Sequence, residues 1–276
     1  MRSIAIARLL TPTSPLLHRA GSDARQLSHT IANEGATSAS ARISMATGRL
    51  TVRGGASALM DGDFTYDPEL EPQFAYAVRD GRGELRVEQP SRRGIFLHRA
   101  HNDWDVRFSN EIPLALGVSL ASSSSRFDAE PLNLTALDIE SASGGCGIRL
   151  GGPKPELRDV QARVVSGDLR LRMTGEYAQP MTVTVSTVSG DMELDLSGAW
   201  HASASVSVRV TSGDISLRVP SNVAVQMRVR SKSGDVRASG LERTGKGLVN
   251  SLVGVAAVGL DIDVETVSGD IRVDGR

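Results

Sequence analysis

The 276-residue sequence has one cysteine, Cys146, and aromatic residues make up only 4% of it. A single cysteine excludes an intrachain disulfide and a cysteine-based metal site. The formal net charge is −1, so no overall positive field recruits nucleic acid or an anionic membrane. The longest apolar run, residues 253–260, is far shorter than the roughly 18–20 residues that a membrane-spanning helix needs. What remains is a hydrophobic content of 40%, which predicts an aliphatic core.

The N-terminal residues show no pattern of a folded element. Residues 1–22 carry arginines and no acidic residue, and Arg8 interrupts the apolar stretch after Ile4. This interruption makes a poor signal-peptide core. We expect residues 1–35 to be a disordered tail or part of an over-extended gene start, with a targeting segment as the alternative. The sequence is compatible with the cytoplasm or with the cell envelope.

The strongest internal feature is a Ser-Gly-Asp tripeptide that recurs through the second half of the chain. Its glycines, with that of the degenerate copy Ser-Gly-Gly, are Gly144, Gly167, Gly190, Gly213, Gly234 and Gly269. The first three steps are 23 residues, the next is 21 and the last is 35. A nearly constant period of this size is the signature of a repeat architecture.

Apolar and polar residues alternate on both sides of each tripeptide. Around Gly190, the apolar side chains include Val183 and Val185 before it and Met192 and Leu194 after it. Period-two alternation predicts half-buried strands. The apolar residues are odd-numbered before Gly190 and even-numbered after it, so the buried face changes sides across the tripeptide. A flat strand cannot change faces in this way without a bend or bulge. Ser-Gly-Asp is therefore predicted to be a corner, where glycine permits a positive φ and the flanking side chains bond the turn.

Aligning the copies at 23 residues places like residues in columns. One column contains Val160, Val183 and Val206, and another contains Tyr177 and Trp200. Stacked units bury apolar faces that a single unit cannot bury. The chain is thus predicted to be all-β, a single-stranded, parallel β-helix-like solenoid with roughly 21–23-residue coils and Ser-Gly-Asp corners. An antiparallel sandwich is the alternative architecture.

The repeat region divides into a less regular and a more regular part. Weaker copies are predicted around Gly48 and Gly83, so residues 36–110 are expected to form N-terminal β coils with insertions. Residues 111–276 are expected to form the regular Ser-Gly-Asp solenoid.

Several segments resemble a known bacterial family. They are Asn110–Leu120, Leu137–Glu140, the Ser-Gly-Asp copies and the segments Leu241–Arg243 and Gly247–Asn250. Over residues 41–276 the chain resembles toast-rack proteins, which include the putative-adhesin β-repeat family and the C-terminal part of LiaF-like proteins. The resemblance implies a β-solenoid near the bacterial envelope, with a role in stress sensing or adhesion. We expect a protein partner, with membrane and envelope proteins as the candidates.

No catalytic constellation stands out, and we predict no catalytic residue, cofactor or resident metal. His98 and His101 match no metal-ligand pattern, and Cys146 falls in an apolar column, as a core residue does. The one candidate metal site is a ladder of aspartates that follow the corner glycines: Asp168, Asp191, Asp214, Asp235 and Asp270. Stacked coils place such carboxylates about 4.8 Å apart, where calcium would relieve their repulsion. Turn chemistry is the interpretation we favour, because the nine-residue glycine-aspartate pattern of calcium β-rolls is missing.

The long final step of the repeat, around residues 241–260, predicts an insertion. Its apolar residues are Leu248, Val249, Leu252, Val253, Val255 and Val258. It either packs back as one more strand pair or exposes a surface for a partner. The last strand is predicted to present Asp270, Arg272, Asp274 and Arg276 on its outward side, which indicates protection of a terminal edge.

These features lead to three functional hypotheses. The first is a non-catalytic binding or scaffold protein, adhesin-like and linked to the bacterial envelope or its stress response. The second is a β-helix enzyme that acts on polysaccharides, disfavoured because the regular repeat offers few aromatic residues for sugar stacking. The third is a structural protein that self-assembles through the ends of its solenoid.

Overall fold

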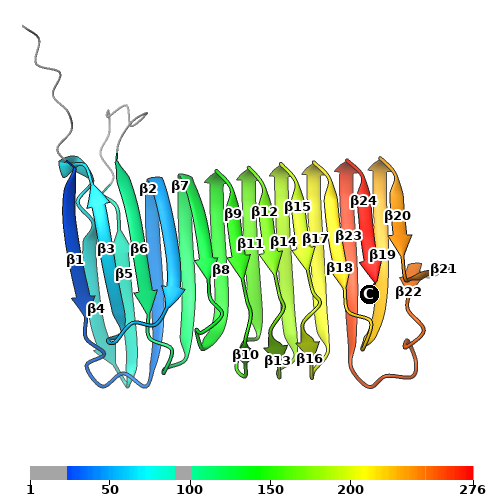
Figure 1. Cartoon of the computed structure of the whole chain (residues 1–276), viewed down its shortest axis with the longest axis horizontal. Coiled ribbons are helices and arrows are strands. Elements are labelled where there is room, and N and C mark those ends of the chain that lie inside the picture. Colours follow the sequence, from blue (N-terminus) through cyan, green and yellow to red (C-terminus); the bar gives the residue numbers. More distant parts are fainter. Residues whose placement is uncertain (1–23, 91–100, 246, 276) are drawn as a thin grey trace, which may run out of the picture.

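The computed structural model describes residues 24–90, 101–245 and 247–275, and it forms one elongated stack of β-coils (Figure 1). The predicted all-β solenoid is confirmed. In the described residues the only helical element is a 3-10 turn at Pro68–Leu70. Each regular coil has a long strand before the corner and a short strand after it, and the two face each other across an aliphatic core.

The middle of the stack is sequential. Its strands, in chain order, are β7 (Leu114–Asp128), β8 (Leu134–Ser143), β9 (Cys146–Arg149), β11 (Asp159–Ser166), β12 (Leu169–Arg172), β14 (Met181–Ser189), β15 (Met192–Asp195), β17 (Ala204–Ser212) and β18 (Ile215–Val219). Strand β14 pairs in parallel with β11 and β17, so Val183 lies between Val160 and Val206 as the columns predict. On the other wall, β15 pairs in parallel with β12 and β18.

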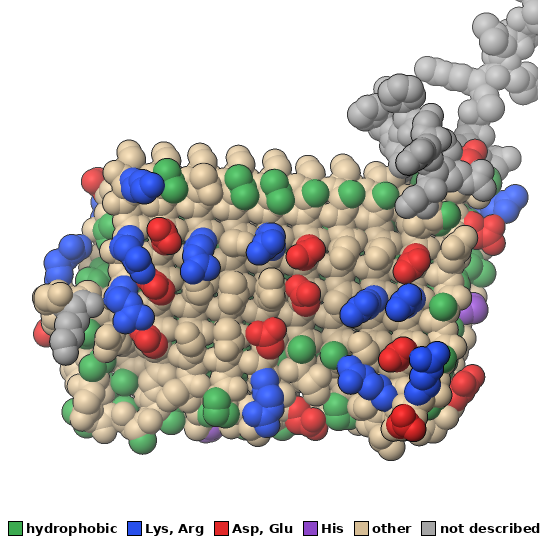
Figure 2. Space-filling view, turned by 180° about the vertical axis from the view of Figure 1, so that it is seen from behind, with side chains coloured by type: hydrophobic (Ala, Val, Ile, Leu, Met, Phe, Trp, Pro, Cys, Tyr) green, Lys and Arg blue, Asp and Glu red, His purple; other side chains and the backbone are tan. Residues whose placement is uncertain are grey.

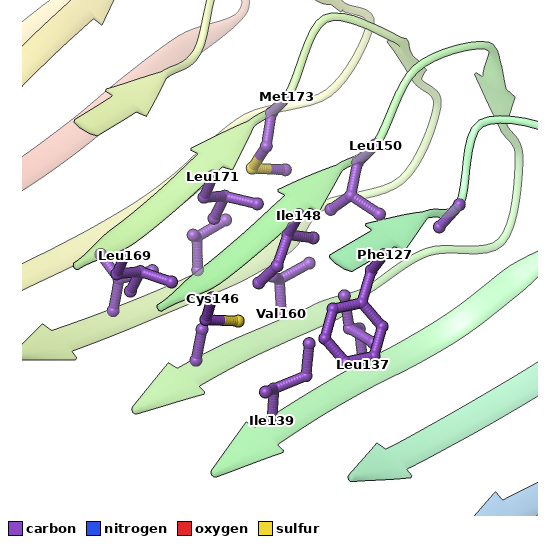
Figure 3. Close-up of a cluster of buried hydrophobic side chains, with 14 of the residues drawn as sticks. Phe127, Leu137, Ile139, Cys146, Ile148, Leu150, Val160, Leu169, Leu171 and Met173 are labelled. Carbon is purple, nitrogen blue, oxygen red and sulfur yellow. The ribbon is translucent and has the colours of Figure 1, made fainter. Parts of the chain in front are cut away.

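The core consists of inward-facing side chains from the two walls. Figure 3 shows Ile139, Cys146, Ile148, Leu169 and Leu171 pointing into this space from β8, β9 and β12. All five are at most 3% exposed. Each buried aliphatic side chain contributes about 1.5–3 kcal/mol, so the columns are the main source of stability.

A short third wall closes the side opposite the corners. It consists of β10 (Pro153–Lys154), β13 (Glu176–Tyr177) and β16 (Ala199–Trp200), paired in parallel. The rings of Tyr177 and Trp200 are in contact, tilted by 31° with centroids 4.5 Å apart, as their predicted column requires. Lys154 is fully buried at the start of this row and donates hydrogen bonds to the main-chain oxygens of Glu130 and Pro153. Burial lowers the pKa of Lys154 to about 8, although the charge of Glu130 opposes this shift.

The N-terminal end departs from sequential stacking. Its strands are β1 (Arg25–Ile31), β2 (Ser38–Gly54), β3 (Met60–Tyr66), β4 (Gln73–Arg79), β5 (Arg82–Glu88) and β6 (Asn102–Phe108). Strand β2 pairs in parallel with β7 on one side and with both β5 and β6 on the other. The antiparallel strands β4, β3 and β1 then cover the end of the stack.

Two expectations for this region are wrong. Residues 25–31, within the predicted tail, form β1, which pairs with β3 from Arg25↔Tyr66 to Ile31↔Met60. Residues 1–23 lie outside the described residues. Gly83 is not a corner either, because β4 and β5 form an antiparallel hairpin whose turn is at Asp80 and Gly81, both with positive φ.

The C-terminal end also changes order. The strands are β19 (Ala224–Ser233), β20 (Val236–Ser239), β21 (Glu242–Thr244), β22 (Gly247–Val249), β23 (Gly259–Ser268) and β24 (Ile271–Gly275). Strand β23 pairs in parallel with both β17 and β19, and β24 pairs with both β18 and β20. The last coil of the chain therefore lies between its two predecessors (Figure 1, red between yellow and orange).

The prediction that the last strand of the chain protects a terminal edge is wrong. β24 is not a terminal edge, because it has a hydrogen-bonded strand on each side. The alternation of Asp270, Arg272 and Asp274 therefore lies within a sheet and protects no edge. The terminal coil of the stack is β19 and β20.

Candidate functional site

The corners are built around glycines whose conformation other residues avoid. Gly144, Gly167, Gly190, Gly213, Gly234 and Gly269 all have φ between +112° and +142°. The glycines also stack tightly, since a Cβ on Gly190 would lie 2.3 Å from the main-chain oxygen of Gly167. Both the dihedral angle and the close approach therefore require glycine at these positions. Gly48 in β2 has φ +122° and is a corner of the same kind.

The aspartates after the glycines form a hydrogen-bonded ladder. The main-chain N–H of Asp191 donates to Asp168 Oδ1 (3.2 Å), and that of Asp214 donates to Asp191 Oδ1 (3.0 Å). The ladder continues through Asp270, whose N–H donates to Asp214 Oδ1, and ends at Asp235, whose N–H donates to Asp270 Oδ1, both at 2.9 Å. Each of these hydrogen bonds joins the corner of one coil to the corner of the next. This is a turn role for the aspartates, which is the interpretation that we favour over calcium binding. Among the described residues, no group of three or more His, Cys, Asp or Glu side chains has the arrangement of a metal site.

Calcium is expected to change stability little. A ligand of the folded state stabilises it by RT ln(1 + [L]/Kd), about 2.7 kcal/mol at one hundred times Kd. Because one oxygen of the Asp168, Asp191, Asp214 and Asp270 carboxylates already accepts a main-chain N–H, we expect melting curves in millimolar calcium and in excess EDTA to coincide. A clear rise of the melting temperature with calcium, absent with magnesium, would make the ladder a metal site.

The remaining candidate reactive groups lie apart from one another. Cys146 is 3% exposed, and burial raises the pKa of its thiol to about 11. A thiol of this pKa is a poor nucleophile at neutral pH. His101 lies 4.0 Å from Asp67, and His29 stacks on Phe74 at 4.1 Å. His98 lies outside the described residues. No nucleophile and base come together at these positions.

The predicted insertion divides into a capping hairpin and an exposed loop. Strands β21 and β22 form an antiparallel hairpin, and β22 pairs with Gln226 and Met227 of β19. Leu248 is 4% exposed and belongs to the core, and Val258 packs against it. The hairpin is therefore the strand pair that the sequence left open as one alternative.

The loop that follows the hairpin is anchored by Asn250. Its Oδ1 accepts the N–H of Val225 (3.0 Å), and its Nδ2 donates to the oxygen of Val223 (2.7 Å). Beyond this anchor, Val253 is 37% exposed and Val255 is 78% exposed. Val249 and Leu252 are half-buried. Of the six predicted surface residues, only Val253 and Val255 are exposed to solvent.

An apolar row that was not predicted lies two residues before several of the corner glycines. Val165, Val188 and Val267 are 41–48% exposed, and Figure 2 shows a row of hydrophobic side chains along one edge of the molecule. The local sequence carried the signal, because Val-Ser-Gly-Asp recurs and this valine is out of phase with the buried positions. Each of these valines directly follows a buried residue (Val164, Thr187 or Thr266), so strand alternation turns it outward. Neighbouring coils have Ala142 and Thr211 at this position.

The described part of the chain has no helix with the length and apolar character needed to cross a membrane.

Comparisons with known proteins agree on the architecture. Residues 20–172 match the family model for the N-terminal domain of toast-rack proteins, DUF2154. Residues 167–273 match the model for the C-terminal part of the cell wall-active antibiotics response protein LiaF. No curated protein matches the chain.

Two solved structures that align with the chain are described as a putative cell adhesion protein and a putative adhesin. A putative cell adhesion protein from Clostridium sporogenes aligns with a TM-score of 0.51 and 19% identity, over 92% of this chain and 100% of that one. A putative adhesin from Bacteroides fragilis aligns with a TM-score of 0.42 and 12% identity, over 90% and 97% of the two chains. At this identity, the first of these supports the fold alone.

Proposed function

Since the chain belongs to the toast-rack family, we propose that it is a non-catalytic binding or scaffold protein of the bacterial cell envelope or of its stress response. The match of residues 167–273 to the LiaF C-terminal model carries the link to the envelope. The lack of any grouping of catalytic side chains in the described residues favours binding over catalysis. We further propose that a membrane or envelope protein contacts the C-terminal end of the stack.

The single observation that carries this location is the exposed loop between Asn250 and Gly259. Val255 is 78% exposed, more than any other large hydrophobic residue described. Exposed apolar side chains at the end of a rigid scaffold are a common form of binding surface. Because Val253 and Val255 are exposed, unlike Leu248, which packs in the core, they contribute little to the core and remain available to a partner.

A paired substitution in the native host tests this proposal. The double variant Val253→Ser, Val255→Ser is expected to keep its melting temperature within about 1–2 °C, because surface changes cost about 0.5 kcal/mol or less. It is expected to shift from the envelope fraction to the soluble fraction of the cell. The control is Val165→Ser, Val188→Ser, in which the two valines are 45% and 48% exposed on the apolar row. Unchanged fractionation of the first variant, or an equal shift of both, would contradict the proposal.

A further inference from the structure

The terminal coil leaves one strand edge open. Strand β19 pairs with β23 over its whole length. On its other side, within the described residues, β22 pairs only with Gln226 and Met227. From Arg228 to Ser233 the outer edge of β19 therefore has no neighbouring strand.

The main chain along this open edge directs hydrogen-bonding groups outward. At Val225, both the N–H and the C=O bond to Asn250 on the hairpin side, at 3.0 and 3.1 Å. The N–H of Ala224 instead donates to Val258, on the β23 side. Because these directions alternate along a strand, the N–H and C=O groups of Val229 and Ser231 point to the open edge. Unpaired groups of this kind are a template for an incoming strand.

The core beneath this edge is incompletely covered. Val229 of β19 and Val236 of β20 are only partly buried, whereas Val264 and Ile271 in the coil beneath them are at most 1% exposed. The hairpin covers the first half of the coil through Leu248, but it does not reach the half nearest the corner. An added strand would bury this remaining apolar surface.

The charge of the terminal coil indicates the chemistry of that strand. The coil beneath is acidic, with five acidic residues and one arginine on β23, on β24 and at the corner between them. Its Asp261 pairs with Arg228 at 3.2 Å and its Asp263 with Arg230 at 3.0 Å. Lys232 has no ion pair among the described residues, and Lys and Arg side chains gather at this end of the molecule (Figure 2, left). An acidic strand would continue this alternation of charge along the stack.

We propose that the open edge of β19, from Arg228 to Ser233, takes an extended acidic segment of a partner protein as an additional strand. This inference rests on the proposed binding function and names the mode of binding. Side chains alternate between the faces of a strand, so the segment would place apolar residues over Val229 and acidic residues beside Lys232. The end strands of a second copy fit poorly, because β1 and β4 contain arginines and no acidic residue.

A labelled peptide tests the edge directly. The probe is a short fluorescein-labelled peptide that alternates glutamate with valine, and binding to the full chain is followed by fluorescence anisotropy. Ser231→Pro removes an outward N–H, and Lys232→Glu reverses the local charge. Each is expected to weaken binding about tenfold or more. The controls are Ser231→Ala, which keeps the N–H, and Arg163→Glu, an exposed arginine on the same face at mid-stack.

The outcomes separate the alternatives. Binding that the two edge variants weaken and the two controls preserve supports the proposal, provided that all four keep the wild-type melting temperature. No binding to the wild-type chain, or equal weakening by Arg163→Glu, would overturn it. Equal binding of a peptide with lysine in place of glutamate would remove the acidic specificity. Concentration-dependent dimers in size-exclusion chromatography, lost in Ser231→Pro, would assign the edge to a second copy. If the peptide does not bind but the Val253→Ser, Val255→Ser variant still shifts to the soluble fraction, the edge proposal fails and the proposed binding function stands.

Discussion

Replacement of Gly190 by valine is expected to reduce the free energy of unfolding by more than about 3 kcal/mol. Gly190 has φ +134°, a conformation that a β-branched residue adopts only with strain. Its added Cβ would also lie 2.3 Å from the oxygen of Gly167, a main-chain atom that cannot move without opening the corner. Urea denaturation followed by circular dichroism measures the change.

Gly147→Val is the matched control for this substitution. Gly147 lies in β9 with no positive φ, and its added Cβ would be 4.0 Å from the nearest atom, the oxygen of Ser125. A valine there faces outward from a strand, which is a favourable setting for it, so stability should change by less than about 1 kcal/mol. Similar losses for the two variants would show that corner geometry is not what requires Gly190.

Removal of the last coil of the chain is expected to destabilise the protein severely, although it lies at the C-terminus of the sequence. A chain that ends at residue 258 loses five core residues that are at most 1% exposed: Leu260, Ile262, Val264, Ile271 and Val273. It also leaves β19 and β20 without the coil on which they stack. We expect a loss of more than about 5 kcal/mol and a fall in melting temperature of about 10 °C or more.

The matched deletion removes the coil that is terminal in space. Replacing residues 221–257 with a short Gly-Ser bridge connects β18 directly to β23 and keeps the β17–β23 and β18–β24 pairings. We expect this variant to be the more stable of the two, because it loses only a coil with one neighbour. The opposite ranking in thermal melts would mean that the coils stack in the order of the sequence.

Local sequence was sufficient to predict the strands, their buried faces and the corners. Alternation identifies the inward residues, as at Val183 and Leu194, because successive side chains of a strand point to opposite faces. The glycine corners follow from the change of parity and from the φ that glycine alone adopts easily. The apolar row could have been predicted in the same way, from the valine that falls out of phase before the tripeptide.

Two features were missed for different reasons. Gly83 had the spacing of a corner, but Asp80-Gly81, a local hairpin signal, forms the turn between β4 and β5. Residues 25–31 had no repeat signature, and they form a strand that pairs with β3, a segment some 35 residues away in the chain.

The stacking order at the two ends was decided only in the tertiary structure. Every coil fills the same inward columns with apolar residues, so β17 could be extended by β19 as it is by β23, where Val206 lies beside Ile262. The repeat thus determined what each coil is, because strand alternation and glycine conformation are local properties. The tertiary structure determined which coil lies beside which, because that order depends on contacts between segments far apart in the chain. These contacts include the pairing of β22 with β19 and the ion pairs of Arg228 with Asp261 and of Arg230 with Asp263. The reach of the linkers between coils acts in the same way.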